Sequence, residues 1–205
     1  MSCYTREQVE STVKSKGYKW FEDINNKGYD VNIVGIRNSK TKGRVTNAFD
    51  DCITISYKID GEWQFHCFPC TTDPGSHWVK NILSEQGVAI LKPNQYRGSH
   101  KLRLHQGKYL ALGQKKPVTV YRDNNLDSNY DLDESKTETG IFGINIHRAT
   151  GRSGGKSTRI DKWSAGCQVI ADNDDWHQFL DICQSAREIH GNSFSYTLLE
   201  SKEII

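Results

Sequence analysis

The chain has 205 residues, of which 36% are hydrophobic and 25% are charged, and its net charge is +2 at pH 7. This composition is typical of a folded domain and excludes global disorder. The small net charge gives little support for nucleic-acid binding, and no segment approaches the roughly 18 consecutive apolar residues of a membrane-spanning helix. We therefore expect neither a nucleic-acid partner nor membrane insertion.

The first predicted element is a short helix. Thr5-Arg-Glu-Gln8 has the form of a capping box, and Gly17 ends the helix after about Lys16. We assign residues 1–28 to an N-terminal helical segment and residues 29–205 to the main domain.

Strand-like runs separated by turns follow the helix. The runs 52–59 and 62–68 flank Asp60-Gly61, a dipeptide typical of tight β-hairpins. Further strands are expected at 29–36, 87–91, 101–105, 108–112, 117–122, 141–147, 167–171 and 193–199.

One helix is predicted late in the chain. Asp172 or Asn173 can cap it, apolar residues then recur at helical spacing, and Gly191 ends it. The predicted fold class is therefore mainly β, a sheet sandwich or barrel with peripheral helices.

The stretch "KWSAGCQVI", residues 162–170, places Cys167 directly behind Gly166. A structural cysteine needs no neighbouring glycine, whereas a nucleophilic cysteine benefits from one because the backbone must approach the substrate. Backbone N–H groups around Gly166 and Cys167 could then stabilise an oxyanion.

A candidate base lies in the run "GINIHR". Strand alternation places Ile144 and Ile146 on one face and His147 on the other. A nearby imidazole favours thiolate formation, so His147 could activate the cysteine if their strands are neighbours. The backbone carbonyl of Arg148 could orient the imidazole ring.

The spacing of these residues is specific. His147 is followed by the 16 residues 148–163 and then by Ser164-Ala165-Gly166-Cys167. This arrangement resembles the motif of L,D-transpeptidase (YkuD-like) domains, in which a histidine precedes Ser/Thr-His-Gly-Cys at similar spacing. The resemblance implies an L,D-transpeptidase-like β-sandwich or barrel, with residues 29–205 as the catalytic domain.

The same resemblance implies a function. Cys167 would be the acyl-forming nucleophile, His147 its base, and peptidoglycan stem peptides the substrate. Ala165 replaces the family's second histidine, and Val169 stands where asparagine or arginine is usual. Acyl transfer and hydrolysis of a stem-peptide bond therefore both stay open. The chain also resembles phage-encoded relatives of this fold, such as endolysins.

Four further residues are expected to line the substrate pocket. Ser164 and Trp163 belong to the motif or adjoin it, and His100 or His105 could supply the imidazole that Ala165 lacks.

The acidic run 123–134 predicts a calcium site. Its oxygen-bearing residues fall at positions 1, 3, 5, 9 and 12 of the calcium-loop pattern. These residues are Asp123, Asn125, Asp127, Asp131 and Glu134. A solvated acidic turn is the alternative. We expect no required cofactor, and any calcium would be structural.

The start of the chain has no apolar core and no cleavage-like site, so we expect no signal peptide. The protein would be synthesised in the cytoplasm and act on the cell wall after release or as a virion component. Its six cysteines are expected to be mostly free thiols. The alternative from another class is a non-catalytic wall-binding or virion structural protein, and the sequence gives no oligomeric state.

Overall fold

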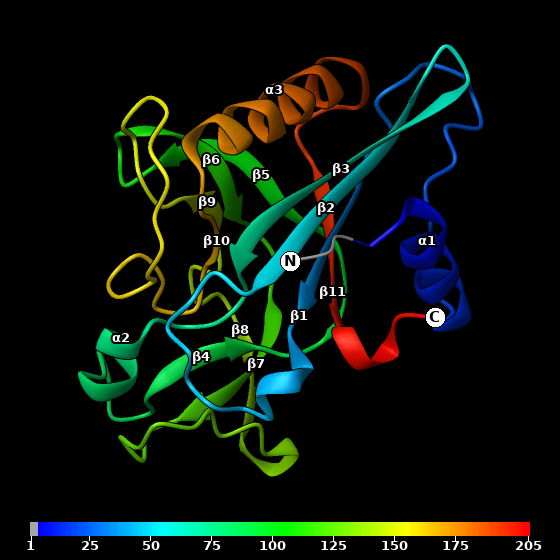
Figure 1. Ribbon diagram of the computed structural model, residues 1–205. Helices are drawn as coiled ribbons and strands as arrows, with labels where there is room; N and C mark the ends of the chain where they lie inside the picture. The colour runs from blue at the N-terminus through cyan, green and yellow to red at the C-terminus, as the bar shows by residue number, and fades with distance from the viewer. Residues whose placement is uncertain (1–3) are drawn as a thin grey trace.

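A computed structural model describes residues 4–205, in which eight strands form a closed barrel (Figure 1). Their order around the barrel is β1-β11-β5-β6-β9-β10-β3-β2. The pairs β1–β11 and β9–β10 are parallel, and the other neighbours are antiparallel. The strands span β1 Asn32–Arg37, β2 Asp51–Ile59, β3 Glu62–Thr71, β5 Asn94–His105, β6 Tyr109–Gln114, β9 Ile146–Arg148, β10 Gln168–Ile170 and β11 Phe194–Glu200.

A small sheet and three helices complete the fold. The sheet has the order β4-β7-β8, with bounds β4 Val88–Leu91, β7 Val118–Asp123 and β8 Thr137–Gly140. The helices are α1 Arg6–Ser15, α2 Ser76–Lys80 and α3 Asn173–His190, and short 3-10 turns occur at Ser39–Thr41, Glu134–Lys136 and Ser201–Glu203. The mainly β prediction is confirmed.

Two elements were not predicted, and both lack a strong local signal. Helix α2 has only five residues and no side-chain cap, and strand β8 has the exposed polar sequence TETG. Helix α2 is held by residues distant in sequence, since Gly75 N donates to Ser164 O and Ser76 N donates to Asn47 Oδ1, whereas β8 forms by pairing with the preceding strand β7.

Helix α1 begins at the predicted capping box, since the Thr5 side chain accepts from Gln8 N while the Gln8 side chain accepts from Thr5 N. Its Val9 and Val13 pack in one cluster with Val34 of β1 and Leu199 of β11. The N-terminal helix therefore lies against the outside of the barrel.

Helix α3 lies across the upper end of the barrel in Figure 1. Asp172 caps it by accepting a hydrogen bond from Asp174 N. Its Trp176 and Phe179 are buried in the same core as Leu112 of β6. The helix therefore closes this end of the barrel core. Burying each of the two aromatic side chains contributes about 2 kcal/mol to the free energy of unfolding.

Two further sequence predictions agree with the structure. Asp60 and Gly61 both have positive φ, as a tight β2–β3 hairpin turn requires. Among residues 4–205, Cys52, Cys70, Cys167 and Cys183 are free thiols, whereas Cys67 is disulfide-bonded. Cys3 lies outside the described residues.

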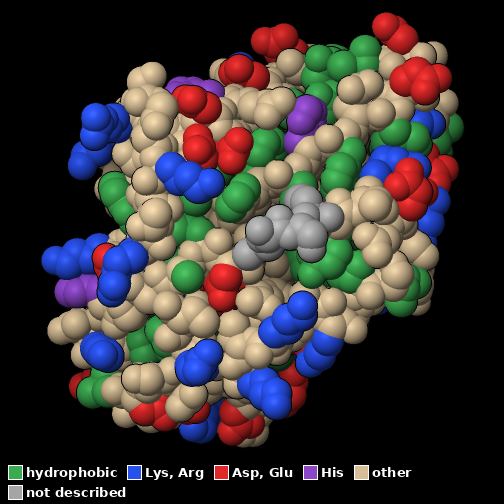
Figure 2. All heavy atoms as spheres, viewed as in Figure 1, with side chains coloured by type: hydrophobic (Ala, Val, Ile, Leu, Met, Phe, Trp, Pro, Cys, Tyr) green, Lys and Arg blue, Asp and Glu red, His purple; other side chains and the backbone are tan. Residues whose placement is uncertain are grey.

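Charges of both signs are spread over the face seen in Figure 2. Within the described residues, no helix is long and apolar enough to cross a membrane.

Candidate active site

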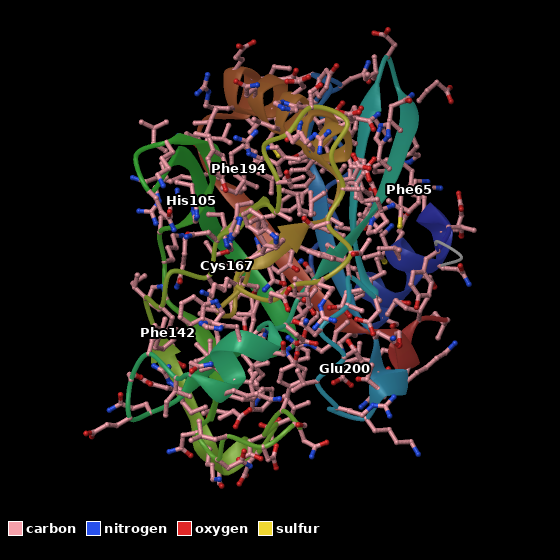
Figure 3. The ribbon with its side chains drawn as sticks, turned by 60° about the vertical axis from the view of Figure 1, so that its left-hand side comes forward. Phe65, His105, Phe142, Cys167, Phe194 and Glu200 are labelled. Atoms are coloured by element: carbon pink, nitrogen blue, oxygen red, sulfur yellow. The ribbon has the colours of Figure 1, made fainter. Side chains whose placement is uncertain are left out.

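Strands β9 and β10 bring His147 and Cys167 into one neighbourhood. The two strands are parallel neighbours, with Val169 opposite His147, and Gln168 N donates to Asn145 O at 2.9 Å. The side chains of His147 and Cys167 line the same cavity, which has a volume of about 640 Å³. In Figure 3, Cys167 lies on the same side of the molecule as His105, which lines that cavity too.

The His147 ring is held as a neutral imidazole. Its Nδ1 lies 2.9 Å from the carbonyl oxygen of Arg148, and because a carbonyl only accepts, Nδ1 carries the proton. Burial lowers the pKa of His147 to about 4, with the Arg148 bond opposing this and the charge of His105 adding to it. At neutral pH the lone pair is therefore on Nε2, which is the form a general base needs.

The Cys167 side chain is half-buried. Its thiol donates to the carbonyl oxygen of Gly143, with an Sγ–O distance of 3.2 Å. Burial raises the pKa of Cys167 to about 11, and a backbone hydrogen bond from Asn145 only partly opposes this. The resting pair is therefore a neutral thiol beside a neutral imidazole, and sulfur becomes nucleophilic only when a base removes its proton.

Gly166 is fixed by both conformation and space. Its φ is +130°, and an added Cβ would lie 2.2 Å from the carbonyl oxygen of Ala89. Its N–H donates to Ser164 Oγ at 3.1 Å, so the expectation that this N–H faces an oxyanion is corrected. Within residues 4–205 the Cys167 N–H has no hydrogen-bond acceptor, which leaves it as the available donor.

Ser164 was predicted to line the substrate cavity, but it does not. It is completely buried, and its hydroxyl accepts from Gly166 N and donates to Cys167 O at 2.8 Å. The serine therefore shapes the turn that presents the cysteine.

His100 does not line the substrate cavity either, although the sequence analysis named it as a candidate. The ring is completely buried, with Nδ1 2.8 Å from Ser99 Oγ and Nε2 2.9 Å from Ile144 O. Both ring nitrogens are occupied away from the cavity, so this histidine cannot replace the one missing at Ala165. It instead holds the segment that leads into β9.

A pH-dependent stability difference follows from His100. Burial lowers its pKa from the usual 6.5 to about 4. Between these values the unfolded chain binds a proton that the folded chain does not, so the contribution of His100 is present above pH 6.5 and is lost as the pH falls toward 4. The unfolding free energy of wild type is expected to fall by about 3 kcal/mol relative to His100→Asn over this range. Urea unfolding at pH 7 and pH 4 measures it.

Leu112→Ala is the control for this measurement. It removes a completely buried side chain without removing a titrating group, so its cost of about 2–5 kcal/mol should be the same at both pH values. A His100→Asn difference that stays constant with pH would contradict the prediction.

His105 and Trp163 do line the cavity, as predicted. The His105 ring stacks on His147 with 4.4 Å between centroids, and burial and the charge of Arg103 lower its pKa. Trp163 is 46% exposed, which leaves its ring available to a ligand.

Tyr109 is a cavity residue that the sequence reasoning missed. Its hydroxyl lies 3.4 Å from His147 Nδ1, and the guanidinium of Arg148 lies 4.3 Å from the centre of its ring. Other missed lining residues are Trp78, Leu83, Gln106, Lys108 and Lys162. Strand alternation places Tyr109 on the same face of β6 as Ala111, but no local pattern shows that this face meets the cavity.

A second cavity of about 460 Å³ adjoins the first. Cys167, His105 and Gln106 line both, whereas His147 lines only the larger. The thiol therefore lies where two cavities meet.

A buried side-chain network supports the cysteine loop from within the barrel. Gln168 Nε2 donates to Gly166 O at 3.2 Å, and Gln168 Oε1 accepts from the hydroxyl of Tyr196 at 2.8 Å. Tyr196 fits because β1 carries Gly35 opposite its ring, where a Cβ would lie 1.8 Å from the tyrosine oxygen. This network fixes the peptide group that precedes the thiol.

The calcium-binding arrangement does not form. Glu134 is turned away, since its carboxylate accepts from the hydroxyl of Tyr121 at 2.8 Å and pairs with Lys92. The Asp131 carboxylate accepts a hydrogen bond from the Asn125 side-chain amide, whereas in a calcium loop both side chains would bind the same cation. The described residues contain no group of three His, Cys, Asp or Glu side chains placed to hold a metal. Calcium binding by Asp123, Asn125, Asp127, Asp131 and Glu134 therefore stays a prediction that this geometry does not support.

Comparison with models of known protein families, with curated proteins and with solved structures finds no match for this chain.

Proposed function

We propose that this chain is a cysteine enzyme that acts on peptidoglycan stem peptides through an acyl-enzyme on Cys167, in a barrel of the L,D-transpeptidase type. The observation that carries the proposal is that the Cys167 thiol and the neutral imidazole of His147 line one cavity. The spacing from His147 to Ser164-Ala165-Gly166-Cys167 supports the substrate class.

The proposed reaction has two steps. His147 Nε2 takes the thiol proton while Sγ of Cys167 attacks the peptide carbonyl carbon, and the carbonyl oxygen becomes an oxyanion that accepts from the Cys167 N–H. The intermediate collapses as the C–N bond breaks, and His147 returns the proton to the leaving amine. An amine or water then attacks the thioester carbonyl carbon while His147 Nε2 takes its proton, and the C–S bond breaks as His147 returns that proton to Sγ.

The two departures from the motif have local explanations. Ala165 lines the cavity without offering a polar group, and His105 brings an imidazole to the same cavity from β5. Val169 is completely buried opposite His147, so a longer polar side chain would not fit there without movement. The proposal therefore keeps the nucleophile and base but leaves acyl transfer and hydrolysis as its two forms.

The two cavities favour a reaction with two peptide segments. A donor peptide can occupy one side of Cys167 while the leaving group, and later an acceptor amine or water, occupies the other.

Product analysis tests the proposal. Purified protein is incubated with stem peptides and an amine acceptor, and the products are weighed. A cross-linked product indicates acyl transfer, and a shortened stem indicates hydrolysis. Unchanged peptides would contradict the proposal.

One observation favours a second candidate, a non-catalytic wall-binding or virion structural protein. Burial raises the pKa of Cys167 to about 11, as it does for thiols that only pack. Binding to isolated cell walls without any product would support this candidate.

A further inference from the structure

The walls of the two cavities that meet at Cys167 carry basic side chains and, within residues 4–205, no aspartate or glutamate. Arg103 lines the smaller cavity, and Lys108 and Lys162 line the larger. None of these three cations forms an ion pair with another described residue. A cavity with unpaired cations and no carboxylate favours an anionic ligand.

Arg103 is a solvent-exposed residue at the wall of the smaller cavity, and its side chain lies over two small residues of β6. It lies opposite Ala111, which lines the same cavity. An added Cβ on Gly113 would lie 1.9 Å from Arg103 Nε and 2.7 Å from its Cδ. The side chain therefore crosses Gly113, and a larger residue there would displace it.

The position of His147 indicates which segment of the substrate each of the two cavities would bind. The leaving amine must receive its proton from His147, which lines only the larger cavity. The leaving residue therefore occupies the larger cavity, and the acyl-donor segment occupies the smaller cavity with Arg103.

We propose that Arg103 is a specificity-determining residue that pairs with a carboxylate on the acyl-donor side of the scissile bond. This inference rests on the function proposed above. A guanidinium binds a carboxylate through two parallel hydrogen bonds, which a carboxamide cannot match. A stem peptide with a free carboxylate on its acyl-donor side would therefore be preferred over the same peptide with that group amidated.

The test compares three synthetic stem peptides: the free acid, the same peptide amidated on the acyl-donor carboxylate, and the same peptide amidated on the leaving residue. Each is assayed for kcat/KM with wild type, Arg103→Met and Gly113→Ala. Arg97→Met is the matched control, because Arg97 lies on the same strand but lines a separate cavity. Peptide affinity is measured in parallel on the Cys167→Ala background.

Wild type is expected to prefer the free acid over the donor-side amide by roughly 10- to 100-fold in kcat/KM and in affinity. Arg103→Met should abolish this preference and Gly113→Ala reduce it, while Arg97→Met keeps it. A preference that survives in Arg103→Met, or one that depends only on the leaving-side carboxylate, would overturn the inference and leave the proposed function standing. If no peptide is turned over or bound, the proposed function is overturned and this inference with it.

Discussion

Cys167→Ala is expected to lower stem-peptide turnover by on the order of 10⁴-fold or more, because the acyl-enzyme cannot form without the sulfur. The side chain is half-buried at the meeting point of two cavities, so its loss leaves the barrel core intact. Stem-peptide affinity and the melting temperature should stay close to those of wild type. Steady-state assays, calorimetry and thermal unfolding measure the three quantities.

Cys183→Ala is the matched control. This cysteine is a free thiol as well, but it is completely buried on α3 within the barrel core. Its replacement should lower stability while turnover per folded molecule is retained. Turnover that survives in Cys167→Ala would show that another group is the nucleophile.

Gly166→Ala is expected to remove most activity although the thiol remains. The new Cβ would lie 2.2 Å from a backbone oxygen, that of Ala89, which no rotamer change can relieve. The φ of +130° is also strained for any residue with a side chain. The loop must shift, and a displacement of about 1 Å at the reacting atoms costs roughly 100-fold in rate. Strain and overpacking should together cost about 2–5 kcal/mol in the free energy of unfolding.

Gly154→Ala separates backbone strain from this collision. Gly154 also has a positive φ, at +62°, but nothing lies within 4 Å of its added Cβ. Its replacement should cost about 1 kcal/mol and leave kcat/KM unchanged. Equal kcat/KM losses in both variants would contradict the role assigned to Gly166.

The sequence predicted those features that depend on neighbouring residues. The capping box at Thr5, the turn at Asp60-Gly61 and the cap at Asp172 each use contacts within a few residues, and all three are present. A close backbone approach of the substrate at Gly166 was predicted, but the close approach of the Ala89 carbonyl oxygen, which leaves no room for a Cβ, is contained in no local pattern.

The two histidines of β5 show where a local signal existed but was not used. His100 and His105 are five residues apart, so strand alternation places them on opposite faces. His100 shares the core side with Leu102, whereas His105 shares the cavity side with Arg103. Strand alternation therefore allows only one of these two histidines to line the pocket.

The predicted calcium loop shows a different limit of the sequence. Glu134 has the expected spacing, but its carboxylate is held by Tyr121 and Lys92, which lie outside the loop. Ligand spacing along a chain does not show such competing partners. The same limit applies to Tyr109 and Lys162, which reach the cavity from segments far apart in the sequence.

The most direct test is the intact mass of the protein after brief exposure to a stem peptide and an acid quench. Cys167 as nucleophile predicts a mass increase equal to the donor acyl group, mapped by fragmentation to Cys167 and absent in Cys167→Ala. Turnover without any adduct on this residue, or an adduct mapped to a different side chain, would contradict the acyl-enzyme and the pairing with His147.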